Sequence, residues 1–188
     1  MTDFIYLASK SPRRKELLTQ IGVEFEVINA SIEEVHQKGE SPLDYVLRLA
    51  TEKAQAGWRS KARVNDIPVL GADTVVVLND DILEKPSCER DGKAMLKALS
   101  GNTHIVYTGI CLCMGERLKS AYSKTEVTFA QMSDADVDWY WKVARPDDKA
   151  GAYGIQDQAA RFVSNIKGSY TGVVGLPLFE TSELLKSI

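Results

Sequence analysis

Residues 67–78 combine two apolar runs with a single carboxylate between them, and few folds can accommodate such a segment. The runs at 69–70 and 75–78 are rich in strand-forming residues and lack helical spacing, which is typical of a strand buried on both faces of a sheet. Asp73 then lies inside the strand, where an ionised carboxylate is costly unless it is paired or holds a metal. The alternative is a bulge or bend at 71–73, in which Asp73 caps backbone amides.

The first predicted strand, residues 4–8, leads into a polar loop and then into a helix with clear start signals. Ser11 is a favourable N-cap, and Pro12 suits the first helical position. A strand, a short loop and a helix N-terminus present free backbone amides and the positive end of the helix dipole to an anion. Arg13 and Arg14 oppose that dipole, which a purely structural helix tends to avoid. We interpret the segment as a phosphate site, and the alternative is a solvated basic turn.

The rest of the chain alternates between helical and strand-like patterns. Caps, prolines and glycines set the expected helix ends, and β-branched runs bounded by turn residues set the expected strands. The expected helices are 12–21, 42–59, 89–99, 134–143 and 178–185, and the further strands are 25–29, 82–84, 104–114, 118–129 and 162–166. Two glycine-rich segments lie at 148–156 and 167–177. Mixed helix and strand order, with hairpins late in the chain, predicts an α/β fold with a mixed sheet.

Composition excludes several classes of protein. A net charge of −3 and a pI near 5.5 argue against an extended nucleic-acid-binding surface. The longest apolar runs fall well short of the ~20 residues needed to span a membrane, and residues 1–7 lack the features of a signal peptide. The cysteines are Cys88, Cys111 and Cys113, without metal-binding spacing, and the last two share one face of a strand as small core residues. We therefore expect a reducing compartment, the cytoplasm.

The residues that can carry chemistry are carboxylates and cations in or beside loops. The chain has no P-loop, no dinucleotide-binding glycine motif and no nucleophile elbow. Glu34 and Asp73 offer the oxygen ligands that Mg²⁺ or Mn²⁺ prefers. Metal-assisted attack of water on a phosphoryl centre uses such carboxylates together with cations that bind polyphosphate. The cations of this kind are Arg13, Arg14, Lys53 and Lys85.

Five segments carry a resemblance to a known family: ASKSPRR at 8–14, GADTV at 71–75, EKP at 84–86, KAGAYGIQ at 149–156 and the glycine-rich stretch at 168–177. In this order, over nearly the whole chain, they resemble the motifs of the Maf family of nucleoside triphosphate pyrophosphatases. The resemblance implies one domain over residues 1–188, with a mixed α/β fold like that of Maf and ITPase proteins. It also implies two lobes around a deep cleft, a divalent metal such as Mg²⁺ or Mn²⁺, and release of pyrophosphate from a nucleotide.

The same resemblance assigns roles to individual residues. The family's catalytic aspartate matches Asp73, and the residues leave open whether it is a base or a metal ligand. The loop glutamate, a second metal ligand, matches Glu34, or less well Glu33. Two further groups match by motif: the cations Arg13, Arg14, Lys53 and Lys85, with Lys53 and Lys85 in the catalytic set, and the phosphate-contacting serines Ser9 and Ser11.

Base choice is implied by three positions. Arg13, Thr74 and Gln156 resemble the branch that acts on dTTP and UTP, whereas a sister branch carries Trp at the position of Arg13 and prefers a different base. The amide of Gln156 can donate to O4 and accept from N3–H of uracil or thymine. It discriminates against cytosine when a neighbour, such as Arg13 or Thr74, holds its orientation.

We therefore expect a cytoplasmic enzyme, assembled as a homodimer by the same resemblance, that converts dTTP or UTP to the monophosphate and pyrophosphate. Its role would be to remove non-standard pyrimidine nucleotides or to restrain cell division. Two alternative functions belong to other classes of protein. One is a nucleotide-sensing binding module with little turnover, and the other is a nucleic-acid-binding protein, against which the acidic pI counts.

Overall fold

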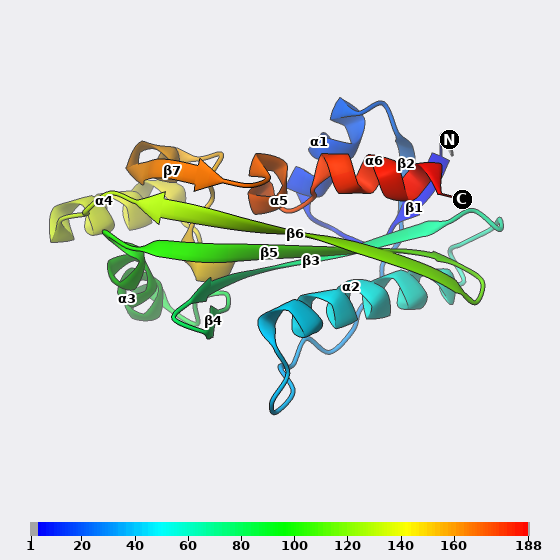
Figure 1. Ribbon diagram of the computed structural model, residues 1–188, viewed down its shortest axis with the longest axis horizontal. Coiled ribbons are helices and arrows are strands. Elements are labelled where there is room, and N and C mark those ends of the chain that lie inside the picture. The colour runs from blue at the N-terminus through cyan, green and yellow to red at the C-terminus, as the bar shows by residue number, and fades with distance from the viewer. Residues whose placement is uncertain (1–3, 188) are drawn as a thin grey trace.

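The segment around Asp73 forms strand β3, Val69–Leu78, in the middle of a seven-stranded sheet (Figure 1). This computed structural model describes residues 4–187, so residues 1–3, on which part of the signal-peptide expectation rests, lie outside it. Strand β3 pairs with β5, Thr103–Met114, in unbroken antiparallel register from Val69 to Val77. The alternative of a bulge or bend at 71–73 is therefore wrong, and Asp73 lies inside a continuous buried strand.

The sheet is mixed, as the sequence predicted. Its strand order is β2-β1-β3-β5-β6-β7, and β4 pairs with β3. Strand β1 is parallel to both β2 and β3, and the later pairs are antiparallel. The remaining strands are β1 (Phe4–Leu7), β2 (Glu24–Val27), β4 (Asp81–Leu83), β6 (Arg117–Phe129) and β7 (Val163–Lys167).

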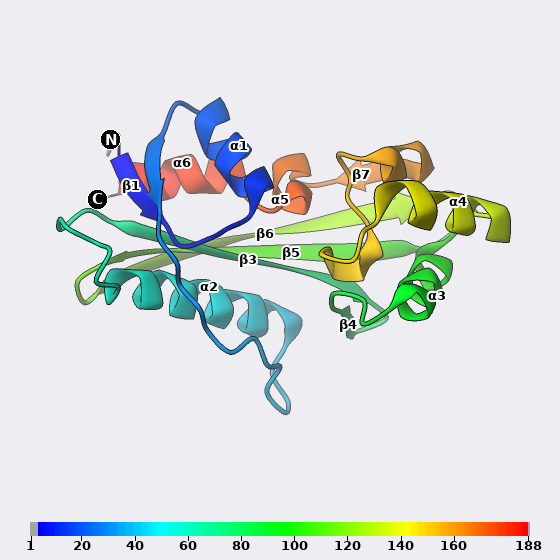
Figure 2. The same ribbon diagram turned by 180° about the vertical axis from the view of Figure 1, so that it is seen from behind.

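Helices cover both faces of the sheet. In Figures 1 and 2, α2 lies on one side of the long strands, and α1, α5 and α6 lie on the other. The helices are α1 (Pro12–Gln20), α2 (Pro42–Trp58), α3 (Glu89–Leu99), α4 (Asp134–Ala144), α5 (Tyr170–Val174) and α6 (Leu178–Lys186). Two short 3-10 helices, Ala150–Ala152 and Gln158–Phe162, follow α4. Helix α5 lies within the second glycine-rich segment, where the sequence pattern indicated no helix.

Helix α2 packs unusually close to β3 and β5, and two glycines make this possible. A Cβ at Gly71 would lie 2.2 Å from the carbonyl oxygen of Ala50, and one at Gly109 would lie 2.9 Å from that of Val46. Neither position could carry a side chain without moving the helix. The close approach brings the side chain of Lys53, on α2, over Asp73 on the strand.

The elements gather at the two ends of the long strands β3, β5 and β6 (Figure 1). One end carries β1, β2, α1 and α6, and the other carries β4, α3, α4 and β7. A cavity of about 870 Å³ lies between them and takes lining residues from both groups. This arrangement confirms the two lobes around a cleft that the resemblance implied.

Two expectations about the chain as a whole can also be compared with the structure. Among residues 4–187, no helix has both the length and the apolar character needed to cross a membrane. Cys111 and Cys113 are buried free thiols that pack beside Ala50 and Ala54, as their spacing on one strand face predicted.

Candidate active site

The cavity collects every residue that the sequence assigned to the site. Strand β3, helices α1 and α2, and the loops around them all contribute to its wall. Both neighbouring candidates are exposed, but Glu34 lies in the wall of the cavity and Glu33 lies outside the lining, which separates the two. The predicted residues that line it are Ser9, Ser11, Arg13, Arg14, Glu34, Lys53, Asp73, Thr74, Lys85 and Gln156.

Two serines shape the entrance to helix α1. The Ser11 hydroxyl accepts the backbone N–H of Arg14 at 3.5 Å, which is the N-cap predicted from the sequence. The Ser9 hydroxyl accepts the backbone N–H of Ser11 at 3.2 Å and an N–H of the Arg14 guanidinium at 3.1 Å. The loop therefore keeps a fixed shape around the N-terminus of α1, where anions bind favourably.

The two arginines of this helix differ in their surroundings. Arg14 donates from Nε to the carbonyl of Gly175 at 2.8 Å and from Nη2 to the Thr74 hydroxyl at 3.3 Å. Burial lowers the pKa of Arg14, an effect that the nearby charge of Asp73 opposes. Arg13 is more open and lies 3.6 Å from the carboxylate of Asp148. Arg14 thus joins α1 to β3 and to the chain after α5, and Arg13 is the arginine available to a ligand.

The Thr74 hydroxyl is part of a chain of hydrogen bonds. Thr108 donates to the carbonyl of Gly172 at 2.7 Å, so its hydroxyl hydrogen is already used. The 2.9 Å contact between the Thr74 and Thr108 hydroxyls is therefore a donation from Thr74. Since Thr74 also accepts from Arg14, its hydroxyl connects β3 to β5 and to α1, and Thr108 extends the chain of hydrogen bonds to α5.

Lys53 bridges the two predicted carboxylates. Its Nζ donates to Oδ1 of Asp73 at 2.6 Å and lies 2.6 Å from Oε1 of Glu34. Lys53 and Asp73 are only 8% and 7% exposed, so this is a buried ion pair with a third, more open member. Lys85 approaches the other oxygen of Glu34 at 3.9 Å. In the part of the chain that the structure describes, Oδ2 of Asp73 makes no hydrogen bond.

The surroundings push the pKa values of the two carboxylates apart. Burial raises the pKa of Asp73 despite the opposing charges of Lys53 and Arg14. Burial also acts to raise the pKa of Glu34, but the hydrogen bond and charge of Lys53 outweigh it, and the pKa falls below its usual value. A carboxylate with a raised pKa and a free oxygen has the properties of a general base, beside a partner that stays ionised.

Gln156 lies in a turn whose neighbouring residues are held by hydrogen bonds of two buried tyrosine hydroxyls. The Tyr140 hydroxyl donates to Oδ1 of Asp157 at 3.0 Å and accepts the N–H of Gly154 at 3.2 Å. The Tyr153 hydroxyl contacts Nε2 of His104 at 2.7 Å. Burial lowers the pKa of His104 to about 4, so the ring is neutral at pH 7.

The lock that the sequence suggested for the Gln156 side chain stays a prediction. Within residues 4–187, the Gln156 side chain has no hydrogen bond to Arg13 or Thr74. The turn is instead oriented through Tyr140. This residue sits on α4, and no local pattern in the sequence connects it to the turn.

Residues 4–188 match the family described as "Maf-like protein". The chain belongs to this family. The Maf-like chain is also similar over most of its length to several relatives of known designation. A dTTP/UTP pyrophosphatase of Aliivibrio fischeri is 49% identical over 183 residues and 96% of each chain. One of Saccharophagus degradans is 51% identical over 96% of this chain and 87% of the relative. One of Pseudoalteromonas translucida is 49% identical over 100% of this chain and 98% of the relative.

Among solved structures, the Maf-like protein is similar to the Ham1 protein of Staphylococcus aureus. The sequences are 16% identical, and the TM-score is 0.49 over 85% of this chain and 90% of the other. We draw no conclusion from a likeness at this level.

The donor set of the Maf-like protein fits a divalent metal that shares its ligands with a substrate. Asp73 and Glu34 each contact the Lys53 ammonium through one oxygen, so Oδ2 of Asp73 and Oε2 of Glu34 are the oxygens that could bind a metal. No group of three or more histidines, cysteines or acids gathers anywhere in residues 4–187. Mg²⁺ commonly takes one or two carboxylates and completes its shell with water and substrate phosphates. These two carboxylates suit that mode and do not form a closed protein cage.

Among the lining residues that sequence reasoning did not assign to the site, two are joined by a hydrogen bond across the cavity wall. The Tyr45 hydroxyl donates to Oε1 of Glu84 at 3.3 Å, and both residues line the cavity. A signal for Tyr45 was present, because Tyr45, Leu49 and Lys53 recur every four residues and share one face of a helix. Glu84 precedes Lys85 in the family motif, but its pattern alone gives no role.

Proposed function

We propose that this Maf-like protein is a nucleoside triphosphate pyrophosphatase that hydrolyses dTTP and UTP to the monophosphate and pyrophosphate. The observation that carries the proposal is the cavity in which Lys53 bridges Asp73 and Glu34 beside the N-terminus of α1. Relatives that are 49% to 51% identical over nearly the whole chain carry the name dTTP/UTP pyrophosphatase. Both lines support the same reaction.

In this proposal Asp73 receives a proton from the attacking water. Among the described residues, Lys53 contacts Oδ1 and nothing hydrogen-bonds to Oδ2, and burial favours the protonated form of this cavity-lining carboxyl. A base whose pKa is raised toward neutral pH gains driving force for proton transfer. If Asp73 instead holds the metal, the same free oxygen is its ligand atom.

Cations on different elements stabilise the leaving pyrophosphate. Arg13 reaches the cavity from the first turn of α1, and Lys85 reaches it from the chain after β4. The backbone amides at the start of α1 add fixed donors that need no rearrangement as charge develops. A divalent metal held by Asp73 and Glu34 would add Lewis-acid activation of the phosphoryl group when bound.

The experiment that tests the proposal is incubation with a panel of nucleoside triphosphates and Mg²⁺, with orthophosphate and pyrophosphate assayed separately. We expect monophosphate and pyrophosphate in equal amounts from dTTP and UTP. Nucleoside diphosphate and orthophosphate as products would show attack at the γ-phosphorus and would contradict the proposal. Stoichiometric binding without turnover would support a nucleotide-sensing module instead, and tight binding of oligonucleotides would support a nucleic-acid-binding protein.

The cellular setting is also a proposal. We propose that the enzyme acts in the cytoplasm, in keeping with the three free thiols at Cys88, Cys111 and Cys113. There it would remove non-standard pyrimidine nucleotides or restrain cell division. We propose a homodimer, which light scattering coupled to size-exclusion chromatography would test.

A further inference from the structure

Glu34 is carried by a long connection that has little structure of its own. Residues 28–41 join β2 to α2, and the chain around Glu34 forms neither helix nor strand. The next residue, Val35, is 55% exposed, so hydrophobic packing does not hold the chain after Glu34, whereas Ile32, two residues before it, packs against the core cluster around Tyr45. Glu34 nevertheless reaches the Lys53 ammonium at 2.6 Å. Its contact with Lys53 leaves 42% of the carboxylate side chain exposed, and open ion pairs contribute little by themselves.

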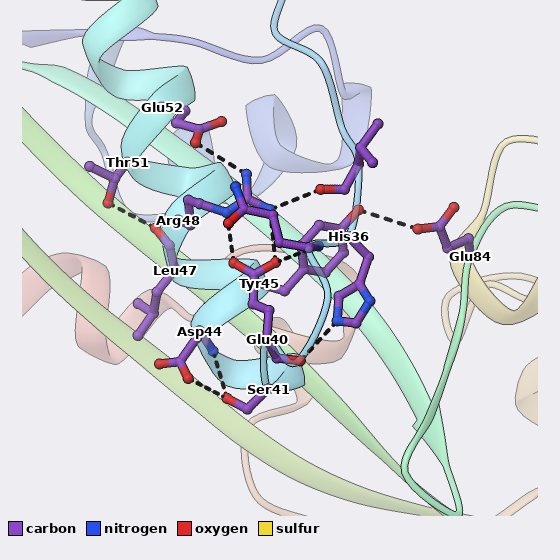
Figure 3. A network of polar contacts seen from close by, with 12 residues as sticks. His36, Glu40, Ser41, Asp44, Tyr45, Leu47, Arg48, Thr51, Glu52 and Glu84 are labelled. Atoms are coloured by element: carbon purple, nitrogen blue, oxygen red, sulfur yellow. Dashed lines mark hydrogen bonds and ion pairs between the residues drawn. The ribbon is translucent and has the colours of Figure 1, made fainter.

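The guanidinium of Arg48 supplies the missing support (Figure 3). Its Nη2 donates to the backbone carbonyl of Val35, the residue directly after Glu34, at 2.9 Å. Its Nε and Nη2 also form a fork with the two carboxylate oxygens of Glu40, at 2.6 and 2.9 Å. One planar group therefore ties two points of the connection, five residues apart, to a single place on α2.

The connection is also closed around Glu40. The Glu40 carboxylate accepts the N–H of Gln37 at 3.1 Å, and its backbone carbonyl contacts Nε2 of His36 at 2.9 Å. The His36 ring packs edge-on against Tyr45, with ring centres 5.2 Å apart (Figure 3). These contacts turn residues 35–40 into a compact loop that is attached to α2 by the hydrogen bonds of Arg48 and by the packing of His36 on Tyr45.

Arg48 itself lies outside the cavity. Tyr45, Leu49 and Lys53 on the same helix line the cavity wall, and Arg48 is not part of the lining. It therefore acts on a bound nucleotide only through the residues that it holds. A lysine could not replace it fully, since one ammonium lacks the planar set of donors that meets a carboxylate and a carbonyl together.

We propose that Arg48 is a positioning residue that holds Glu34 in the active-site cavity by anchoring the backbone at Val35. The inference rests on the proposed function for its kinetic test. Lys53 and Arg48 hold Glu34 from two sides: one contacts the carboxylate and the other contacts the chain that carries it. Loss of the backbone anchor leaves Glu34 held by the Lys53 contact and, earlier in the chain, by the packing of Ile32.

The test compares Arg48→Lys with Glu52→Gln. Glu52 accepts from Nη1 of Arg48 at 3.1 Å, so its substitution perturbs the same guanidinium and leaves the Val35 and Glu40 contacts in place. We expect Arg48→Lys to lower kcat for dTTP by about tenfold or more, the scale of a lost hydrogen bond to a charged group. We expect Glu52→Gln to stay within about twofold of the parent enzyme. Glu40→Gln removes half of the fork, should act in the same direction as Arg48→Lys, and replaces it if that variant does not fold.

Two further measurements separate positioning from general destabilisation. In a Glu34→Gln background, Arg48→Lys should change kcat by less than about twofold, because the group that it positions is gone. Trypsin should also cut after Lys38 faster in Arg48→Lys than in the parent at equal thermal stability, since the loop opens locally. Additive effects in the double variant, or unchanged cleavage at Lys38, would overturn the inference. If no nucleotide is hydrolysed, the proposed function fails, and the cleavage rate alone decides about Arg48.

Discussion

Replacing Asp73 with Asn should abolish most of the activity and at the same time make the protein more stable. Asn keeps the size and one oxygen acceptor for Lys53, but it can neither take a proton nor bind a metal strongly. We expect kcat to fall by about 10² or more, the scale of a lost general base. Lys53 keeps its 2.6 Å contact with Glu34, so its charge is not left unpaired in the variant.

The gain in stability follows from the direction of the Asp73 pKa. Burial raises this pKa in the folded protein above its ordinary value of 3.8, so folding favours the protonated carboxyl. The contribution of Asp73 to the stability of the parent protein is therefore fully present below about pH 3.8 and is lost as the pH rises through the folded pKa. The Asn side chain does not titrate, so the variant does not lose stability in this way as the pH rises. At pH 7 we expect Asp73→Asn to unfold with about 1 to 2 kcal/mol more free energy, a rise of about 2 to 8 °C in Tm.

The assay is thermal unfolding of both proteins between pH 3 and pH 8 in EDTA, which removes any metal bound at the site. Plotted against pH, the Tm values of the two proteins should coincide at the acidic end and separate as the pH rises. Titrating Mg²⁺ in the activity assay then distinguishes the two roles of Asp73. A metal ligand shifts the half-saturating Mg²⁺ concentration in the variant, and a base lowers kcat at saturating Mg²⁺. Full activity of Asp73→Asn, or failure to fold, would refute the reasoning.

Two further predictions concern base selection. Gln156→Ala should reduce the preference for UTP over CTP, measured as a ratio of kcat/KM, by about tenfold, since each mismatched buried polar contact costs about 1–3 kcal/mol. An unchanged ratio would remove Gln156 from base selection. Tyr140→Phe should lower the free energy of unfolding by about 1–3 kcal/mol, because it leaves the N–H of Gly154 unpaired, and it should also weaken the same preference. Tyr6→Phe is the matched control. The Tyr6 hydroxyl accepts the N–H of Val64 at 3.3 Å, and Tyr6 does not line the cavity. This control should lower stability alone, and an equal loss of preference in both variants would contradict a specific role for Tyr140.

Element boundaries could be predicted from the sequence wherever the signals that set them are local. Ser41 and Pro42 start α2 where expected, because a capping hydroxyl and a proline act on the backbone of the next turn. Ser133 starts α4 by the same means, with Asp136 completing a capping box. The motifs that indicated the family are also local, since each lies within a dozen residues and carries its own turn chemistry.

The bulge alternative at Asp73 failed for a reason that no window of sequence contains. Ten residues of β3 stay in one strand because β5 pairs with it along nearly its whole length, with partners that lie 28 to 44 residues away in the chain. That pairing, and the Lys53 ammonium delivered by α2, let a carboxylate remain in the middle of a buried strand. Helix α5 was missed similarly, because Ser169 caps it within a segment whose glycines argue against a helix.

By itself, the sequence determined the fold class, the positions of most helices and strands, and a set of predicted site residues that all line the cavity. The tertiary structure decided how those residues are held: Glu34 rather than Glu33 enters the cavity, Arg48 anchors its loop, and Tyr140 orients the turn of Gln156. Caps, turns and periodic patterns act over a few residues and leave a trace in the local sequence. A hydrogen bond between a helix and a distant loop leaves none, since any arginine or tyrosine on a helix looks the same until the chain has folded.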